Sequence, residues 1–325
     1  MARRDLIVIG GSAGSLEAIQ EFLPLLPTGL PVSILITIHT RQDRSSHLAE
    51  VINRKTDWLA KHPSNGEKMK PGHIYVAPNN LHLLVVDGYM LLRDGPRQNL
   101  HRPAIDPLFQ SAARRHGSGV IGVLLSGLMA DGVSGLLEIQ QKGGYTIVQE
   151  PSSAGFSALP QSALDYFSPD AVLTPKEIPR QLSELVSDKV SVQPAEEPDL
   201  DITDLEEVLL TEIKDQPGEP TDFACPDCGS GLWQTEVRGF VRFRCHIGHT
   251  YTSEQLLSQQ TDSIERCYWK ILRLLKERAS LQYMLADEAT LAEVHSSADH
   301  YSQHAQLDRK RLKLMQEHLK LGRPW

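Results

Sequence analysis

Short apolar runs alternate with segments of helical spacing along the first half of the chain. Three of these runs are rich in β-branched residues and occupy residues 6–9, 32–38 and 120–125. Such runs are typical of strands that are buried on both faces of a parallel sheet. The segment after the first run has apolar residues three or four positions apart, at Leu16, Ile19 and Leu23. Strands that alternate with helices predict an α/β fold with a doubly wound, mostly parallel sheet.

Two further patterns belong to the same region. Apolar runs at residues 83–86 and 89–92 are separated by Asp87-Gly88, which predicts an antiparallel hairpin with a two-residue turn. A helix face and a later strand at residues 146–148 are also expected, and the helix face is marked by Ile105, Leu108, Phe109 and Ala112.

The last part of the chain has the spacing of long helices. From Ser253 onward, apolar residues recur near heptad spacing, at Leu256, Ile264, Cys267, Ile271, Leu274, Leu281, Met284 and Leu285. A second stretch carries Leu307, Leu312, Leu314, Met315 and Leu319. Two helices joined within residues 289–298 would form an antiparallel hairpin or part of a coiled coil, with Cys267 as a core residue. Homodimerisation through these helices, docking on a receptor and binding of another regulator are roles that the sequence leaves open.

The distribution of charge separates these regions. The net charge of the chain is −8, yet residues 191–222 alone carry eleven Asp or Glu, one Lys and four Pro, a net charge of −10. An acidic, proline-rich stretch predicts a solvated linker, although a short amphipathic piece at residues 205–213 would also suit docking. We therefore expect an α/β domain at residues 1–190, an acidic linker at 191–222, a small module at 223–252 and helices at 253–325.

Composition excludes several classes of protein. Hydrophobic residues make up 40% of the chain, and no apolar run approaches eighteen residues, so no membrane insertion is expected. The first strand follows Met-Ala-Arg-Arg-Asp directly, which argues against a cleavable signal peptide. Four cysteines, three of them in one cluster, suit a reducing compartment rather than a disulfide framework. We expect a cytoplasmic protein with no nucleic-acid partner.

The first candidate for chemistry is Gly-Gly-Ser-Ala-Gly at positions 10–14, between the first strand and its helix. A serine between glycines at such a turn exposes its hydroxyl at the carboxyl edge of the sheet, where helix amides face a developing negative charge. Glycine-rich turns of this kind also bind dinucleotides or simply turn the chain. The dinucleotide alternative is weakened because Ser12 occupies the place of the second glycine of that motif, and His39 stands where an acidic ribose-binding residue is needed.

Two more residues occupy matching positions at strand ends. His39 ends the second apolar run and Asp131 lies just past the third, and reactive groups of open α/β sheets gather beyond these carboxyl ends. Ser12 as nucleophile, His39 as its base and Asp131 as the holder of the imidazole tautomer form the set that acyl transfer needs. Taken singly, Asp131 also suits the cap of a helix that begins near Val133, and His39 suits a hydrogen-bonded core histidine.

Four motifs in this region resemble the catalytic domain of the chemotaxis protein-glutamate methylesterase (CheB) family. They are Gly-Gly-Ser-Ala-Gly at 10–14, Ile38-His39, Asn-Leu-His-Arg-Pro-Ala-Ile-Asp at 99–106 and Ser-Gly-Leu-Met-Ala-Asp-Gly at 126–132. The resemblance runs in order from about residue 5 to residue 187. It implies a doubly wound α/β domain with a triad in the chain order Ser, His, Asp, and no cofactor for catalysis.

The resemblance also implies roles for individual residues. Ser12 would be the nucleophile, His39 the general base and then acid, and Asp131 the residue that orients His39. The family hydrolyses γ-glutamyl methyl esters on methyl-accepting chemoreceptors and deamidates certain glutamines. Where it usually has Gly-Met-Gly-x-Asp, this chain has Gly-Leu-Met-Ala-Asp at 127–131. The backbone amide of Leu128 is the oxyanion donor that this turn leaves in place.

Two expectations concern the surroundings of the predicted triad. The best-known members of the family carry an N-terminal receiver domain, but the first strand here begins at Asp5, so we expect no control by aspartyl phosphate from such a domain. His101 and Arg102 precede the helix at residue 105 and are expected to line the cleft. Arg102 suits either a substrate carboxylate or a structural pairing with Asp106 or a neighbouring loop.

A second motif lies after the linker. Cys225-Pro-Asp-Cys228 is followed, after sixteen residues with the pattern of a β-hairpin, by Cys245-His246-Ile-Gly-His249. This spacing is typical of a structural zinc ribbon with four protein ligands. Cys225, Cys228, Cys245 and His249 are the expected ligands, and His246 is the alternative fourth ligand. A redox-active Cys-x-x-Cys pair is the other interpretation. The zinc site is favoured, because a module of about thirty residues needs a cross-link such as a bound metal ion in order to fold.

The sequence therefore predicts a serine hydrolase of the protein-glutamate methylesterase type, followed by a zinc-ribbon-like module and a helical hairpin. Two other functions stay open at this point. A non-catalytic signalling scaffold with an esterase fold would explain the altered turn before Asp131, and a small-molecule carboxylesterase would use the same triad.

Overall fold

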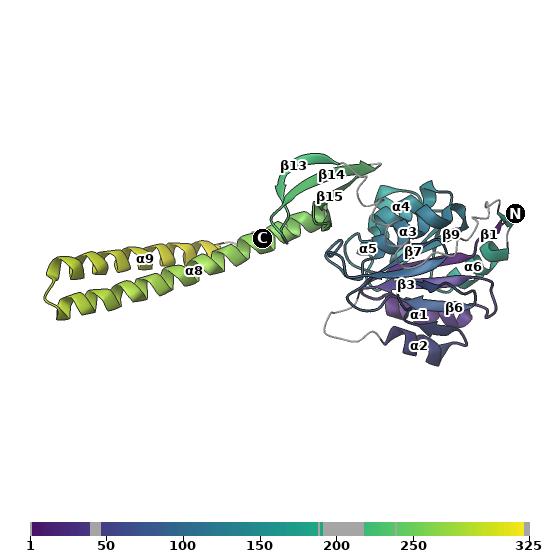
Figure 1. Ribbon diagram of the computed structural model, residues 1–325, viewed down its shortest axis with the longest axis horizontal. Coiled ribbons are helices and arrows are strands. Elements are labelled where there is room, and N and C mark those ends of the chain that lie inside the picture. Colours follow the sequence, from purple (N-terminus) through teal and green to yellow (C-terminus); the bar gives the residue numbers. More distant parts are fainter. Residues whose placement is uncertain (1, 40–46, 188, 191–217, 238, 322–325) are drawn as a thin grey trace. The chain divides into compact units, whose positions relative to one another are not determined.

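The computed structural model describes residues 2–39, 47–187, 189–190, 218–237 and 239–321. These residues form two compact units, residues 1–255 and residues 256–325 (Figure 1). The acidic segment at 191–217, with the amphipathic piece at 205–213, lies outside the described residues. None of the described helices combines the length and the apolar composition that a membrane span needs.

A seven-stranded sheet forms the centre of the first unit, and every strand pair in it is parallel. Its order is β11-β10-β9-β2-β3-β6-β4. The strands are β2 (Leu6–Gly11), β3 (Ser33–Ile38), β4 (Leu59–Lys61), β6 (His73–Val76), β9 (Val120–Leu124), β10 (Tyr145–Gln149) and β11 (Ala171–Leu173). The predicted doubly wound α/β fold is confirmed.

Helices cover both faces of this sheet (Figure 1). Alternate residues of β2 enter different cores: Leu6 and Val8 pack with α3 (Ile105–His116), α4 (Val133–Gln141) and α5 (Ala158–Tyr166). Ile7 and Ile9 pack with α1 (Ser15–Phe22), α2 (Leu48–Lys55) and α6 (Ile178–Ser187). Short 3-10 turns complete the region at η1 (Leu23–Leu25), η2 (Gly117–Gly119) and η3 (Pro151–Ser153). The side-chain alternation of a strand thus explains why β2 is apolar at every position.

Short strands flank the main sheet. The predicted hairpin is present as β7 (His82–Val86) and β8 (Tyr89–Arg93), with β5 (Glu67–Lys68) beside β8. Asp87 and Gly88 have φ values of +44° and +87°, as a two-residue hairpin turn requires. At the edge of the region, β1 (Ala2–Arg3) pairs with β12 (Lys189–Val190).

The direction of chain winding reverses at β2, which has β3 on one side and β9 on the other. The carboxyl ends of these three neighbouring strands therefore border one crevice, which is where open α/β sheets place their ligands. Gly11, Ile38 and Leu124 end the three strands. The loops that follow them are thus brought to a common edge.

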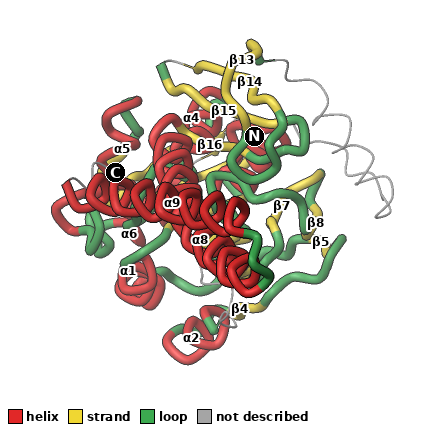
Figure 2. Tube along the Cα trace, turned by 90° about the vertical axis from the view of Figure 1, so that its left-hand side faces the viewer, coloured by secondary structure: helices red, strands yellow, loops and turns green. Residues whose placement is uncertain are grey.

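A separate antiparallel sheet of four strands follows, which we call the C-terminal sheet. It consists of β13 (Glu219–Ala224), β14 (Gly231–Val237), β15 (Phe240–Cys245) and β16 (Thr250–Thr252), in that order (Figure 2). Its first strand begins at Glu219, because Glu219 and Pro220 pair with Gln234 and Trp233 of β14, so residues 219–222 are strand and not linker.

The C-terminal sheet packs against the α/β region within the first unit. Phe240 belongs to the same buried cluster as the residues of α3 and α4. The ring of Tyr166 in α5 lies edge-on to Phe240, with 4.7 Å between centroids. This contact joins two parts that the sequence presents as separate domains.

The second unit is an antiparallel pair of helices, α8 (Ser253–Leu291) and α9 (His295–Leu321), joined within the predicted 289–298 (Figure 1). Its buried positions include Leu272, Ala279, Ala286 and Ala305. Arg278 of α8 donates two hydrogen bonds to the buried Asp308 of α9, both of 2.6 Å. The prediction that Cys267 is a core residue is wrong, because the helices meet along small residues and leave Cys267 exposed.

Candidate active site

Ser12 occupies the turn between β2 and α1. Its amide donates to the carbonyl of Ser126, at 2.9 Å, and its carbonyl accepts from the amide and the hydroxyl of Ser15. Gly14 in the same turn has φ +77°, and a Cβ there would lie 2.6 Å from the Ser126 Oγ. The glycine therefore allows both the turn and the close approach of the neighbouring loop.

His39 follows β3 and joins Ser12 to Asp131. The imidazole Nδ1 lies 3.1 Å from the Ser12 Oγ, and the Nε2 lies 2.6 Å from the Asp131 Oδ2. Because an ionised carboxylate can only accept, the Nε2 carries the hydrogen, and the Nδ1 is free to accept from the serine hydroxyl. The three predicted triad residues are thus brought together in one hydrogen-bonded chain, with His39 and Asp131 almost fully buried.

Asp131 is held by the N-terminus of α3. Its carboxylate accepts from the amides of Ile105, at 2.7 Å, and Asp106, at 3.3 Å. The side-chain amide of Asn99 donates a further bond of 2.7 Å to the Asp131 Oδ1. The N-cap of α4 is Gly132, without a side-chain cap, so Asp131 serves the imidazole and not the following helix.

The electrostatics of Asp131 favour the ionised form. Burial acts to raise the pKa of its carboxyl, but the hydrogen bonds from His39 and from the Asn99 side-chain amide hold that pKa below its usual range. The helix N-terminus adds partial positive charge at the same place. Asp131 therefore stays an acceptor for the His39 N–H over the whole physiological pH range.

His101 lies directly against the imidazole of His39. Its ring stacks on that of His39 with 3.5 Å between centroids and 13° between planes. Burial and the neighbouring His39 lower the pKa of His101 to about 4. His101 is therefore neutral at physiological pH and fixes the plane of His39 without adding charge. The sequence placed His101 at the cleft, and the stacking is what the structure adds.

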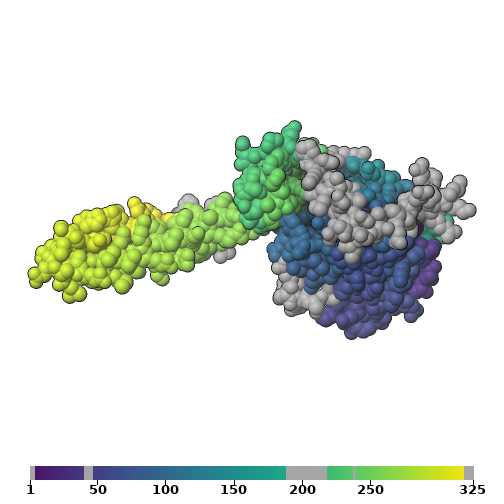
Figure 3. Space-filling view, in the orientation of Figure 1, coloured from purple at the N-terminus to yellow at the C-terminus, as the bar shows by residue number. Residues whose placement is uncertain are grey.

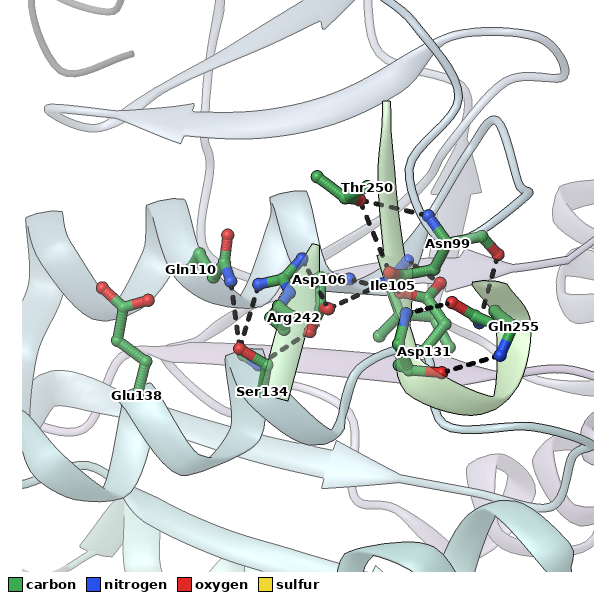
Figure 4. Close-up of polar contacts among 12 residues, drawn as sticks. Asn99, Ile105, Asp106, Gln110, Asp131, Ser134, Glu138, Arg242, Thr250 and Gln255 are labelled. Carbon is green, nitrogen blue, oxygen red and sulfur yellow. Dashed lines mark hydrogen bonds and ion pairs between the residues drawn. The ribbon is translucent and has the colours of Figure 1, made fainter. Parts of the chain in front are cut away.

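Asn99 and Asp106 form a second layer behind Asp131 (Figure 4). The Asn99 amide donates to the Asp106 Oδ2, at 2.7 Å, as well as to Asp131. Asp106 also accepts from the Gly135 amide, at 2.7 Å, and pairs with Arg242 of β15, at 3.2 Å. Sequence reasoning considered Asp106 only as a partner of Arg102 and assigned Asn99 no role, although both lie in the motif at 99–106.

The turn before Asp131 lies against Ser12. A Cβ on Gly127 would lie 2.9 Å from the Ser12 Cβ, so this glycine permits the contact. The Gly127 amide already has a hydrogen-bond acceptor, because it donates to the Phe156 carbonyl at 3.0 Å. Over the described residues, the backbone amide of Leu128 has no hydrogen-bond acceptor, which agrees with its expected use as an oxyanion donor.

Arg102 supports a loop. Its guanidinium donates to the Asn80 side chain and to the carbonyls of Asp94 and Gly95. Of the two alternatives left by the sequence, the structure favours the pairing with a neighbouring loop. The predicted partner Asp106 is bound by Arg242 instead.

Three cysteines and one histidine lie together at the end of the C-terminal sheet where β13 and β15 finish. The ligand atoms of Cys225, Cys228, Cys245 and His249 all lie within 4.8 Å of one another. The Cys228 and Cys245 Sγ atoms are 3.7 Å apart, and the His249 Nδ1 lies 3.3 Å from the Cys245 Sγ. His246 is exposed, and its ring lies beside Trp233 instead.

The geometry of this cluster fits a tetrahedral metal ion. Two thiolates at about 2.3 Å from zinc in a tetrahedral site lie about 3.8 Å apart, which matches the sulfur–sulfur distance. The hydroxyl and amide of Ser230 lower the pKa of Cys228 to about 6, which favours the thiolate that a metal needs. Tyr251 donates to Asp227 and lies 3.2 Å from the Cys225 Sγ.

Comparisons with known proteins agree with this site. A family model described as CheB methylesterase matches residues 7–182. The protein-glutamate methylesterase/protein-glutamine glutaminase of Photorhabdus laumondii is 37% identical over 177 residues, and a protein of that name from Geobacter metallireducens is 38% identical over 181 residues. These matches cover 53% and 54% of this chain. They cover 50% of each relative, so the chain spans about half the length of the curated relatives it matches.

A solved structure is similar over the same region. The Thermotoga maritima CheB methylesterase catalytic domain aligns with a TM-score of 0.54 and 29% identity. The alignment covers 57% of this chain and 100% of that one. The α/β region therefore has the fold of that catalytic domain.

Proposed function

Because the chain belongs to the CheB methylesterase family, we propose that it is a protein-glutamate methylesterase. It would hydrolyse glutamyl methyl esters on a methyl-accepting chemoreceptor or a similar signalling protein. The single observation that carries the proposal is the continuous hydrogen-bonded chain from the Ser12 Oγ through His39 to Asp131. The names of the relatives also include protein-glutamine glutaminase, and the same triad would support deamidation of glutamine.

The reaction follows from the positions of the three side chains. The Ser12 Oγ attacks the ester carbonyl as its proton passes to the His39 Nδ1. The same Nδ1–H then protonates the departing methoxide, which leaves as methanol and gives an acyl-enzyme on Ser12. Water attacks this ester with His39 as the base, and glutamate and free Ser12 result. Asp131 holds the Nε2–H throughout and stabilises the imidazolium in each step.

Apolar side chains around Ser12 favour a protein substrate. Leu128, Met129 and Phe156 are exposed. The Phe156 carbonyl accepts from the Gly127 amide, and the Phe156 amide donates to the Ser126 hydroxyl, so Phe156 is held beside the turn that carries Ser12. Exposed apolar groups at the rim of a catalytic site offer a contact surface for a protein segment. They support a protein ester over a small-molecule ester, and the intact triad supports an enzyme over a scaffold.

Methanol release from methylated receptor fragments tests this proposal. The wild-type chain should release methanol, and Ser12→Ala should lower the rate about a thousandfold or more. Ser152→Ala, an exposed serine of the same region, is the matched control and should keep the wild-type rate. Methanol release that survives Ser12→Ala would refute the nucleophile assignment, and turnover of small esters alone would favour a small-molecule carboxylesterase.

We also propose that Cys225, Cys228, Cys245 and His249 hold one structural zinc ion in a cytoplasmic protein, where thiols stay reduced. Four protein ligands leave no open position for water or substrate. Metal analysis of protein purified under reducing conditions should give one zinc per chain. His249→Ala should lower that content strongly and His246→Ala should not. The reverse result would make His246 the fourth ligand, and zinc-free wild-type protein would favour the redox pair.

The helical hairpin is proposed to form a homodimer. Exposed apolar residues on α8 recur at the heptad spacing of a coiled-coil seam, at Ile264, Ile271, Leu274 and Leu281, and Leu307 and Leu314 on α9 are also seven apart. Figure 3 draws the surface of this unit in light green to yellow. A second copy of the chain offers the same stripe and so satisfies its spacing.

Light scattering on the full chain measures this association. The wild-type chain should have the mass of two chains, and the double substitution Leu274→Glu/Leu281→Glu should give the mass of one. Trp269→Glu is the matched control, because Trp269 is equally exposed on α8 but lies off the stripe. A wild-type chain of single mass would refute the dimer.

A further inference from the structure

We infer that Arg242 is a positioning residue of the triad. By pairing with Asp106 it keeps the Asn99 amide bound to Asp131, so that the C-terminal sheet completes the active site of the α/β region. This inference deepens the proposed esterase function and rests on it. Its support is the arrangement of four side chains, Asn99, Asp106, Asp131 and Arg242, from three separate segments of the chain (Figure 4).

The Asn99 amide nitrogen bridges two buried carboxylates. It donates 2.7 Å bonds to both the Asp106 Oδ2 and the Asp131 Oδ1, and each of the two acids is 1% exposed or less. Two buried negative charges this close are unfavourable unless a positive charge compensates them. Asn99 supplies hydrogen bonds to both but no charge.

Arg242 supplies that charge. Its guanidinium lies 3.2 Å from the Asp106 Oδ2 and donates a 3.0 Å bond to the Ser134 hydroxyl on α4. The arginine side chain is itself only 15% exposed, so solvent screens the pair weakly. Across the described ranges, Arg242 is the one arginine or lysine that forms an ion pair with Asp106.

The pKa of the Asp106 carboxyl lies near the physiological pH range. Burial raises the pKa of Asp106 to about 6, Arg242 opposes the rise, and the Asp131 carboxylate adds to it. Removing the guanidinium therefore moves this pKa further upward, into the neutral range. Among the described residues, the other ionisable groups that act on the two acids are His39, which follows β3, His82 of β7 and His101 of the loop before α3.

A proton on Asp106 would disturb the bridge. The Oδ2 accepts from Asn99 and the Oδ1 accepts from the Gly135 amide, so an added O–H would face donors on both sides. Asn99 could accept that hydrogen only by turning its Oδ1 toward Asp106. The turn would remove its amide nitrogen from Asp131 and loosen the carboxylate that orients His39.

Two further residues after β15 fix the orientation of Asn99. The Thr250 hydroxyl lies 3.4 Å from the Asn99 Oδ1, and the Thr250 carbonyl accepts from the backbone N–H of Asn99 at 2.9 Å. The Gln255 side chain donates to the Asn99 carbonyl at 3.4 Å. The C-terminal sheet and the start of α8 therefore hold both Asn99 and the acid that it bonds.

The test compares Arg242→Gln with Arg242→Lys and Arg244→Gln in the full chain. Arg242→Lys keeps the positive charge. Arg244 is the matched control, because it lies on the same strand two residues away and forms no ion pair with the described acidic residues. Hydrolysis of a neutral aryl ester between pH 5 and pH 9 gives kcat and KM for each variant, and melting temperature verifies folding.

Arg242→Gln should move the acid limb of the kcat profile to higher pH by about one unit, which is about a tenfold loss at pH 6. The rate should return to within about twofold of wild type at pH 9, where Asp106 ionises again, and KM should stay unchanged. Arg242→Lys should restore most of the shift, and Arg244→Gln should leave the profile in place. An unchanged profile, or an equal loss at every pH, would overturn the inference.

A second measurement is independent of ester hydrolysis. The side-chain amide signal of Asn99 in the ¹⁵N spectrum, assigned with Asn99→Ala, should change with pH at a higher midpoint in Arg242→Gln than in wild type. Equal midpoints would overturn the inference even if the chain is an active esterase. If no ester is hydrolysed, the proposed function fails while this titration still judges the role of Arg242.

Discussion

The triad and the cysteine cluster are two sites of one unit that depend on different physical interactions. The triad lies at the ends of parallel strands, and apolar side chains on both faces of the sheet fix those strands. The cysteine cluster lies in the small C-terminal sheet, where the buried apolar or aromatic side chains of the described residues are Leu232, Phe240, Phe243 and Tyr251. The first site is positioned by a large core, and the second has little core of its own.

The two sites therefore keep their geometry by different means. Backbone amides of α3 and the Asn99 side chain hold Asp131 in place without any ligand. The cysteine cluster would instead depend on the proposed zinc ion, since metal binding and folding are coupled in small modules. Arg242 joins the two, because it lies on β15 three residues before Cys245 and pairs with Asp106.

The largest expected effect concerns the triad itself. His39→Ala should lower ester hydrolysis about a thousandfold or more, and the double substitution with Ser12→Ala should add little, because the triad acts as one unit. Steady-state rates with an activated aryl ester measure both. His47→Ala, an exposed histidine of α2's N-terminus, should retain the wild-type rate. Additive losses in the double variant would contradict a single catalytic unit.

Loss of the proposed zinc ion should unfold the C-terminal sheet without unfolding the α/β region that carries the triad. Cys245→Ser, or chelation of the wild-type chain, should abolish amide-exchange protection in residues 219–252. Ester hydrolysis should fall more at pH 6 than at pH 9, since β15 no longer holds the guanidinium, and the smaller loss at pH 9 reports the lost contacts of Thr250 with Asn99. Cys267→Ser removes an exposed thiol of α8 and should change neither property. Equal loss of activity at both pH values would show that the triad depends on the sheet for more than charge.

A smaller effect is expected when the bridge behind the triad is removed. Asn99→Ala should lower kcat by about ten- to a hundredfold and destabilise the fold by about 2 kcal/mol, because two buried carboxylate oxygens lose a donor. Asn53→Ala is the matched comparison, since Asn53 bonds the backbone of Ala60 on the other side of the sheet. It should lower stability by a similar amount and leave kcat unchanged. A similar kcat for the two variants would reduce Asn99 to a structural role.

The smallest effect concerns the pH dependence of stability. The folded-state pKa of Asp106 is raised from 3.8 to about 6, so its ionisation opposes folding, and the penalty grows as pH rises between these values. Asp106→Asn should therefore flatten the loss of unfolding free energy between pH 4.5 and pH 7 by about 1–2 kcal/mol. Denaturant unfolding at several pH values measures the slope. An unchanged slope would show that Asp106 does not titrate in this range.

Much of the site could be predicted because the evidence for it is local in sequence. A serine in a glycine-rich turn, and a histidine and an aspartate at two later strand ends, can be recognised from strand patterns and short motifs. The spacing of Cys225, Cys228, Cys245 and His249 is local in the same way, and the structure brings these four together. The Asp-Gly turn of the β7–β8 hairpin likewise follows from the backbone preference of two residues.

Other features depended on contacts between segments far apart in the chain. The heptad spacing from residue 253 predicted a core through Cys267, yet the helices bury Ala279, Ala286 and Ala305 and leave Cys267 and most of the predicted apolar positions exposed. Helical spacing identifies an apolar face but does not say which of two faces a partner covers. The strand at Glu219 was hidden because its pairing with β14 overrides an acidic, proline-containing composition.

The sequence by itself determined the parallel sheet, the chain order of Ser12, His39 and Asp131, and the residues of the cysteine cluster, because each follows from a periodicity or a short spacing. Only the tertiary structure decided which side chains support Asp131 and His39. The pairing of Asp106 with Arg242 joins residues 136 positions apart, and the stacking of His101 on His39 joins residues of different loops. Such pairs have no local signature, since burial and charge compensation act through space and not along the chain.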